Sequence, residues 1–127
     1  EGAISPEVYV QALEARRRLQ VLYAHVFRSA DVAALVFPTT PGTAARIGED
    51  ETFLLNGRAV PTFATFVRNT DPGSNAGIPG ISLPVGLSDG LPVGLALDGP
   101  QGSDRMLLSI AAAAEAVLPP MSLAPVH

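Results

Sequence analysis

The sequence contains no cysteine and no lysine. Without cysteine the chain can form neither a disulfide nor a thiolate metal site, so the redox compartment stays open and the cytoplasm is the default expectation. All eight basic residues are arginines. A mechanism that uses a lysine as its base therefore cannot reside within these residues.

Long apolar runs and clustered positive charge are also missing. No apolar run approaches the roughly 20 residues that a membrane-spanning helix needs. The net charge of -4 offers no basic face for nucleic acid or an anionic membrane, so neither partner is expected. Glu1 is not followed by the pattern of a signal peptide, and we expect the chain to start inside something longer. At 127 residues and 47% hydrophobic, one compact domain with an apolar core is predicted.

Groups that could carry chemistry are scarce. The two histidines are His25 and His127, and no Gly-x-Ser-x-Gly elbow is present. His25 falls near the end of a predicted helix, where a structural role is favoured over a catalytic one. Two distant histidines and scattered carboxylates lack metal-ligand spacing, and the acidic triplet at residues 49–51 is interpreted as a solvated loop. The glycines between residues 86 and 99 match no nucleotide-binding pattern, so neither a metal nor a cofactor is predicted.

The first helix has a clear start in the sequence. Ser5 can cap it, Pro6 suits its first position, and apolar residues recur at alternating steps of four and three up to Val26. We expect the helix to end near Ser29. The adjacent arginines at residues 16–18 fan around the helix, which favours a solvated face over an anion site.

The middle of the chain predicts one strand, an irregular stretch and a second helix. Residues 32–37 form a short apolar run, typical of a strand that is buried on both faces. Residues 42–60 are interpreted as a surface excursion, in which Asn56-Gly57 indicates a tight hairpin turn. A helix is expected over residues 61–70, interrupted by Pro72-Gly73.

Two further strands and a last helix complete the prediction. The strands cover residues 80–85 and 91–97 and are joined by a turn at Asp89-Gly90. Ser103 is the expected cap of a helix that reaches the prolines at 119 and 120, and residues 121–127 are interpreted as a tail. This order predicts an α/β fold with a three-stranded sheet, flanked by the first and last helices.

Three separated motifs, in the right order, resemble the carboxy-terminal region of the amidase signature family. They are Phe-Pro-Thr-Thr-Pro at residues 37–41, Arg-Asn-Thr-Asp-Pro-Gly-Ser-Asn-Ala-Gly-Ile-Pro-Gly-Ile-Ser-Leu-Pro-Val-Gly at residues 68–86, and Gly-Leu-Pro-Val-Gly-Leu at residues 90–95 followed by Gly99-Pro100. The Arg-Asn-Thr and Leu-Asp-Gly-Pro segments are most similar to indoleacetamide and mandelamide hydrolases. The resemblance covers nearly the whole chain and implies a mixed sheet of about three strands flanked by helices.

The resemblance implies hydrolysis of a carboxamide to an acid and ammonia. In the family a serine attacks, activated by a second serine in a cis peptide and by a lysine, and a glycine- and serine-rich segment upstream supplies these groups. That segment is not represented here, so we expect no catalytic residue in this chain and no activity of the chain alone. The alternative is a binding or interaction module that kept the fold without catalysis.

The resemblance also suggests where the substrate lies. In related glutamine-dependent amidotransferases the position of Val67 looks like an aspartate that holds a charged amine, so valine suits a neutral aryl or alkyl amide. Thr70, Gly73 and Thr39 are the other candidate substrate-binding residues. Val67 as ordinary core, and Thr70 as a hydroxyl bonded to backbone, are equally open interpretations. The expected partners are a small amide and the amino-terminal part of the same protein, with a homodimer left open.

Overall fold

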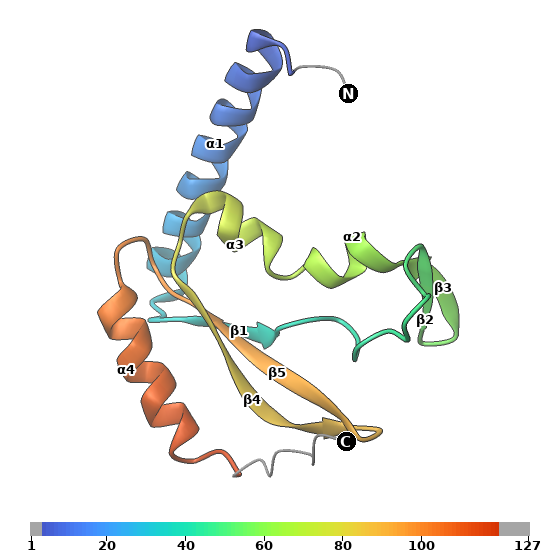
Figure 1. Cartoon of the computed structure of the whole chain (residues 1–127). Helices are drawn as coiled ribbons and strands as arrows, with labels where there is room; N and C mark the ends of the chain where they lie inside the picture. The colour runs from blue at the N-terminus through green and yellow to red at the C-terminus, as the bar shows by residue number, and fades with distance from the viewer. Residues whose placement is uncertain (1–3, 120–127) are drawn as a thin grey trace.

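The computed structural model describes residues 4–119. Its elements are α1 (Pro6–Ala30), β1 (Leu35–Pro38), β2 (Thr52–Leu55), β3 (Arg58–Pro61), α2 (Thr62–Val67), α3 (Asp71–Ala76), β4 (Gly80–Ser88), β5 (Leu91–Asp98) and α4 (Asp104–Glu115). Figure 1 shows them as a small sheet with one helix along it, one long helix projecting away, and a separate hairpin. The predicted α/β class is confirmed, and the predicted tail lies outside the described residues.

Helix α1 begins as the sequence predicts. The Val8 amide donates to Ser5 Oγ over 3.3 Å, and Asp31 ends the helix in the left-handed conformation. The expectation that α1 flanks the sheet is wrong. It packs on α3 instead, where Gln20 Nε2 donates to the Ala76 carbonyl over 2.9 Å, and Phe27 is its one buried side chain. Helix α3, which the sequence did not predict, takes the place beside α1 that was expected for the sheet (Figure 1).

The three predicted strands form one antiparallel sheet in the order β1-β5-β4. Strands β4 and β5 are joined by a tight turn, in which Asp89 and Gly90 have φ of 51° and 79°. Strand β1 is shorter than predicted, and its residues alternate between half-buried and exposed. The prediction of burial on both faces is wrong, because that pattern belongs to the middle of a parallel sheet, whereas β1 pairs with β5 alone and antiparallel.

Helix α4 covers one face of the sheet. The core between them consists of Leu83, Leu97, Leu107 and Ala111. Ser103 precedes α4 as predicted, but its hydroxyl makes no capping hydrogen bond. The helix ends at Glu115, before the expected prolines.

The stretch predicted as an irregular excursion contains an ordered hairpin. Strands β2 and β3 pair around Asn56 and Gly57, which have φ of 51° and 75°, so the predicted Asn-Gly turn is confirmed while the surrounding irregularity is not. The Phe53 and Phe66 rings lie 5.0 Å apart and attach this hairpin to α2. Helix α2 ends at Val67, and the proline predicted as an interruption instead lies in the first turn of α3. Proline is well tolerated there because that turn leaves its amides unbonded.

Candidate functional site

A cavity of about 260 Å³ lies between α3 and the face of the sheet that α4 leaves free. Three of the four predicted substrate-binding residues line it, namely Thr39, Thr70 and Gly73. The fourth, Val67, is half-buried at the end of α2 and is not among the lining residues. The structure thus brings together residues from the end of β1 and the start of α3, which are distant in the sequence.

Two hydroxyl groups on the floor of the cavity bond to each other. Thr39 Oγ1 and Ser82 Oγ are 2.5 Å apart, on the segment after β1 and on β4. This pair lies directly over Gly94, where a Cβ atom would come within 2.7 Å of both oxygens. A glycine at this position of β5 is therefore required for the close approach of the two hydroxyls. Asn69 Nδ2 donates to the Pro38 carbonyl over 2.8 Å, and this bond links the turn before α3 to the end of β1.

The hydroxyls on the α3 side bond to nearby carbonyls. Thr70 Oγ1 donates to the Val67 carbonyl over 3.4 Å, and Ser74 Oγ donates to the Thr70 carbonyl over 3.0 Å. Thr70 therefore makes the backbone bond that one interpretation proposed, and it also lines the cavity. Because α2 ends at Val67, Thr70 follows it through a turn and not along a continuous helix.

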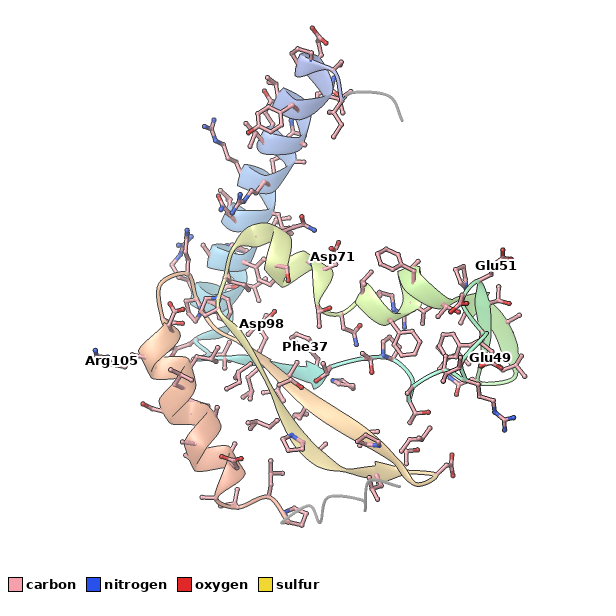
Figure 2. All side chains as sticks on the ribbon, viewed as in Figure 1. Phe37, Glu49, Glu51, Asp71, Asp98 and Arg105 are labelled. Atoms are coloured by element: carbon pink, nitrogen blue, oxygen red, sulfur yellow. The ribbon has the colours of Figure 1, made fainter. Side chains whose placement is uncertain are left out.

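Asp98 is the lining residue that the sequence prediction missed. It lies at the end of β5 beneath α3 (Figure 2), only 7% exposed, and its Oδ2 is buried without a hydrogen-bond partner among residues 4–119. Cβ atoms placed on Gly73 and Gly80 would lie 2.6 Å and 2.8 Å from its two carboxyl oxygens. Burial raises the pKa of this carboxyl above its usual value. Burial, and then the charge of Asp98, raise the pKa of the Tyr23 phenol on α1.

A second hollow of about 390 Å³ lies between α1 and the loops beside α3 and α4. Tyr23 and Phe27 line it, with ring centroids 6.4 Å apart. None of the predicted site residues lies there, so it is not the predicted site.

The other groups weighed from the sequence lie apart from the cavity. His25 is exposed on α1, and Glu49 accepts a hydrogen bond from the Arg46 amide over 3.2 Å, near the β2–β3 hairpin (Figure 2). Within residues 4–119 no three histidine or acidic side chains lie where they could hold a metal ion. The lining of the cavity offers hydroxyls and one carboxyl, which are groups that can hydrogen-bond to a ligand.

The fold is an α/β segment with a cavity on the face of its sheet, and its similarity to known proteins identifies the family. The model of the Amidase family matches residues 2–108. The chain belongs to this family, and the matched part is the carboxy-terminal part of its relatives. No helix within residues 4–119 combines the length and the apolar character needed to cross a membrane.

Curated relatives agree with this assignment. The chain is 54% identical to an indoleacetamide hydrolase of Agrobacterium vitis over 101 residues, which are 79% of this chain and 22% of that protein. It is 42% identical to a mandelamide hydrolase of Pseudomonas putida over 115 residues, 88% of this chain and 22% of that protein. The chain therefore spans about a quarter of the length of such relatives.

Solved structures show the same arrangement. A crystal structure of an amidase superposes with a TM-score of 0.83 at 29% identity, covering 91% of this chain and 26% of the other. The structure of a 6-aminohexanoate cyclic dimer hydrolase superposes with a TM-score of 0.74 at 27% identity, covering 91% of this chain and 25% of the other.

Proposed function

We propose that this chain serves as the carboxy-terminal part of an amide hydrolase that converts a carboxamide to a carboxylic acid and ammonia. The observation that supports this most strongly is the family match over residues 2–108, together with a superposition that covers 91% of the chain. In this proposal the chain contributes three strands and one wall of the acyl pocket. Thr39, Thr70 and Gly73 belong to that wall, and a role of Val67 beside it stays a prediction.

The chemical step belongs to another part of the same protein. The sequence has no lysine and no glycine- and serine-rich segment of the kind that supplies the nucleophile in the family. A nucleophile, its activating base and the oxyanion donors act as a unit, so a wall of the pocket without them binds but does not hydrolyse.

The proposed substrate is a small amide with an uncharged aryl or alkyl side chain. The relatives named above act on indoleacetamide and mandelamide, according to their names. The apolar part of the cavity lining, which includes Ile78 and Ala96, suits such a side chain.

The test is ammonia release by the complete gene product that carries this sequence. Indole-3-acetamide, mandelamide and phenylacetamide are the substrates, and an amide with an aminoalkyl side chain is the comparison. We expect turnover of at least one neutral aryl amide and little of the cationic one. A folded gene product that binds these amides without releasing ammonia would favour the non-catalytic module instead.

A further inference from the structure

Asp98 is the polar side chain of the cavity that has a buried atom without a hydrogen bond within residues 4–119. The hydroxyls of Thr39 and Ser82 bond to each other, and those of Thr70 and Ser74 bond to backbone carbonyls. Asp98 Oδ2, in contrast, is buried with no hydrogen-bond partner within residues 4–119. A nearly buried carboxyl without a donor is costly. Oδ2 is itself closed off, whereas Oδ1 makes no hydrogen bond among these residues and is not among the buried atoms, so a donor that enters the cavity would reach Asp98 at Oδ1.

No positively charged side chain within residues 4–119 forms an ion pair with this carboxyl. The ion pair found among residues 4–119 joins Arg18 to Glu14, on the exposed surface of α1. The titratable group whose pKa responds to Asp98 is the Tyr23 phenol, and that pKa is raised. Asp98 is therefore not half of a structural ion pair within the described residues.

The carboxyl is held in a narrow slot. Gly73 lies against Oδ2 and Gly80 against Oδ1, each so near that a Cβ atom would come within 2.8 Å of an oxygen. Both glycines also line the cavity. A side chain confined from two sides keeps one orientation, which is the condition for selecting a ligand group by its position.

We propose that Asp98 is a specificity-determining residue, and that its carboxyl accepts a hydrogen bond from a single neutral N–H or O–H donor on the side chain of the bound amide. This inference rests on the proposed amide hydrolase function. A neutral donor fits better than an ammonium, because an ammonium carries three N–H groups that all need acceptors. The Thr70 and Ser74 hydroxyls already donate to backbone carbonyls, and the apolar side chains of Ile78 and Ala96 offer no further acceptor.

The test compares amides that differ in one donor. The first pair is indole-3-acetamide and benzofuran-3-acetamide, in which an oxygen that cannot donate replaces the ring N–H with little change in size. The second pair is mandelamide and phenylacetamide, which differ by one hydroxyl. In the complete enzyme we expect kcat/KM to favour the donor by about 10- to 100-fold in one of the pairs, the range of a hydrogen bond to a charged group. The pair that responds tells whether the donor lies on the ring or beside the amide carbon.

Two variants of Asp98 and one control attribute the effect. Asp98→Leu keeps the shape but removes the acceptor, so the preference should fall to within about threefold of unity. Asp98→Asn keeps one acceptor oxygen and should retain part of the preference. Asp50→Leu, an exposed acid away from the cavity, should keep the wild-type ratio. These ratios are insensitive to the amount of active enzyme.

Each other outcome overturns the inference. Wild-type ratios near unity in both pairs do so without any variant, which covers the case that Asp98→Leu fails to fold. A preference that survives in Asp98→Leu assigns the selection to another residue. A preference for an aminoalkyl amide that is lost in Asp98→Leu assigns Asp98 to cations. These three results leave the proposed function standing, whereas wild-type enzyme without turnover of any amide refutes the proposed function itself.

Discussion

Replacing Gly73 by alanine tests whether α3 and Asp98 are packed as tightly as the cavity requires. Gly73 is in the first turn of α3, and its φ is not in the left-handed region. On helix propensity alone, alanine should stabilise the protein by up to about 1 kcal/mol. The added Cβ would, however, lie 2.6 Å from Asp98 Oδ2.

The steric effect should outweigh the propensity. Asp98 has little room to swing away, because its other oxygen lies so near Gly80 that a Cβ atom added there would come within 2.8 Å of it. Overpacking of this kind costs about 1–3 kcal/mol, so we expect Gly73→Ala to lower the free energy of unfolding by a net amount of up to about 2 kcal/mol. In an Asp98→Ala background the obstacle is gone, and the same exchange should become stabilising by up to about 1 kcal/mol.

The assay is a double-mutant cycle on denaturant unfolding midpoints. A coupling of about 1–3 kcal/mol between positions 73 and 98 is expected. Asn75→Ala, an exposed change in the same helix, is the matched control and should have equal effects in both backgrounds. If Gly73→Ala stabilises the wild-type protein, or the coupling is below about 0.5 kcal/mol, the slot around the carboxyl is not rigid and the reasoning fails.

Three other perturbations concern the buried carboxyl, the isolated chain and the end of α2. Burial raises the pKa of Asp98, so the stability that its protonated form provides is full below the ordinary pKa near 3.8 and is lost as pH rises through the folded-state pKa. Urea midpoints of Asp98→Asn should therefore gain on those of the wild type as the pH rises above about 3.8. The isolated chain should release no ammonia from indole-3-acetamide or phenylacetamide, and turnover that survives repurification would contradict this. In the complete enzyme, Val67→Asp should lower kcat/KM for neutral aryl amides by an amount equal to about 1–3 kcal/mol of transition-state stabilisation, and should lower it less for amine-bearing amides. If the ratio of kcat/KM between neutral and amine-bearing amides is unchanged in a folded variant, residue 67 lies outside the pocket.

Local sequence signals predicted most of the elements. Ser5 and Pro6 mark the start of α1, and the pairs Asn56-Gly57 and Asp89-Gly90 mark both hairpin turns, because these residues favour the backbone conformations that the turns require. The proline at 72 was misinterpreted, since the same residue that interrupts a helix also starts one. Sequence alone does not distinguish the two cases without knowing where the next helix lies.

Features that depend on packing were not predictable. The exposure of β1 depends on which faces of the sheet are covered, and the projection of α1 depends on its contact with α3. The burial of Asp98 could not be predicted for the same reason. In the sequence it appears as a polar residue at the end of a strand, next to Gly99-Pro100, where an exposed turn is the ordinary expectation. Its burial is produced by Gly73 and Gly80, which are distant in the sequence.

The polar face of the sheet depends on a single irregularity in β4. From the turn outward Ser88 pairs with Leu91 and Gly86 with Val93, and this register continued without change would place Ser82 opposite Leu97. The β-bulge between Pro84 and Gly86 shifts the register by one residue, with Gly86 at a φ of 149°.

Beyond the bulge, Ser82 pairs with Ala96 and Gly80 with Asp98. Since side chains alternate between the faces of a strand, this register puts the Ser82 hydroxyl and the Asp98 carboxyl on the cavity face, and leaves Leu83 and Leu97 for α4. It also places Gly80, which has no side chain, opposite Asp98. The turn alone would have given Gly80 a different partner, so the bulge, and not the turn, creates the slot in which Asp98 lies.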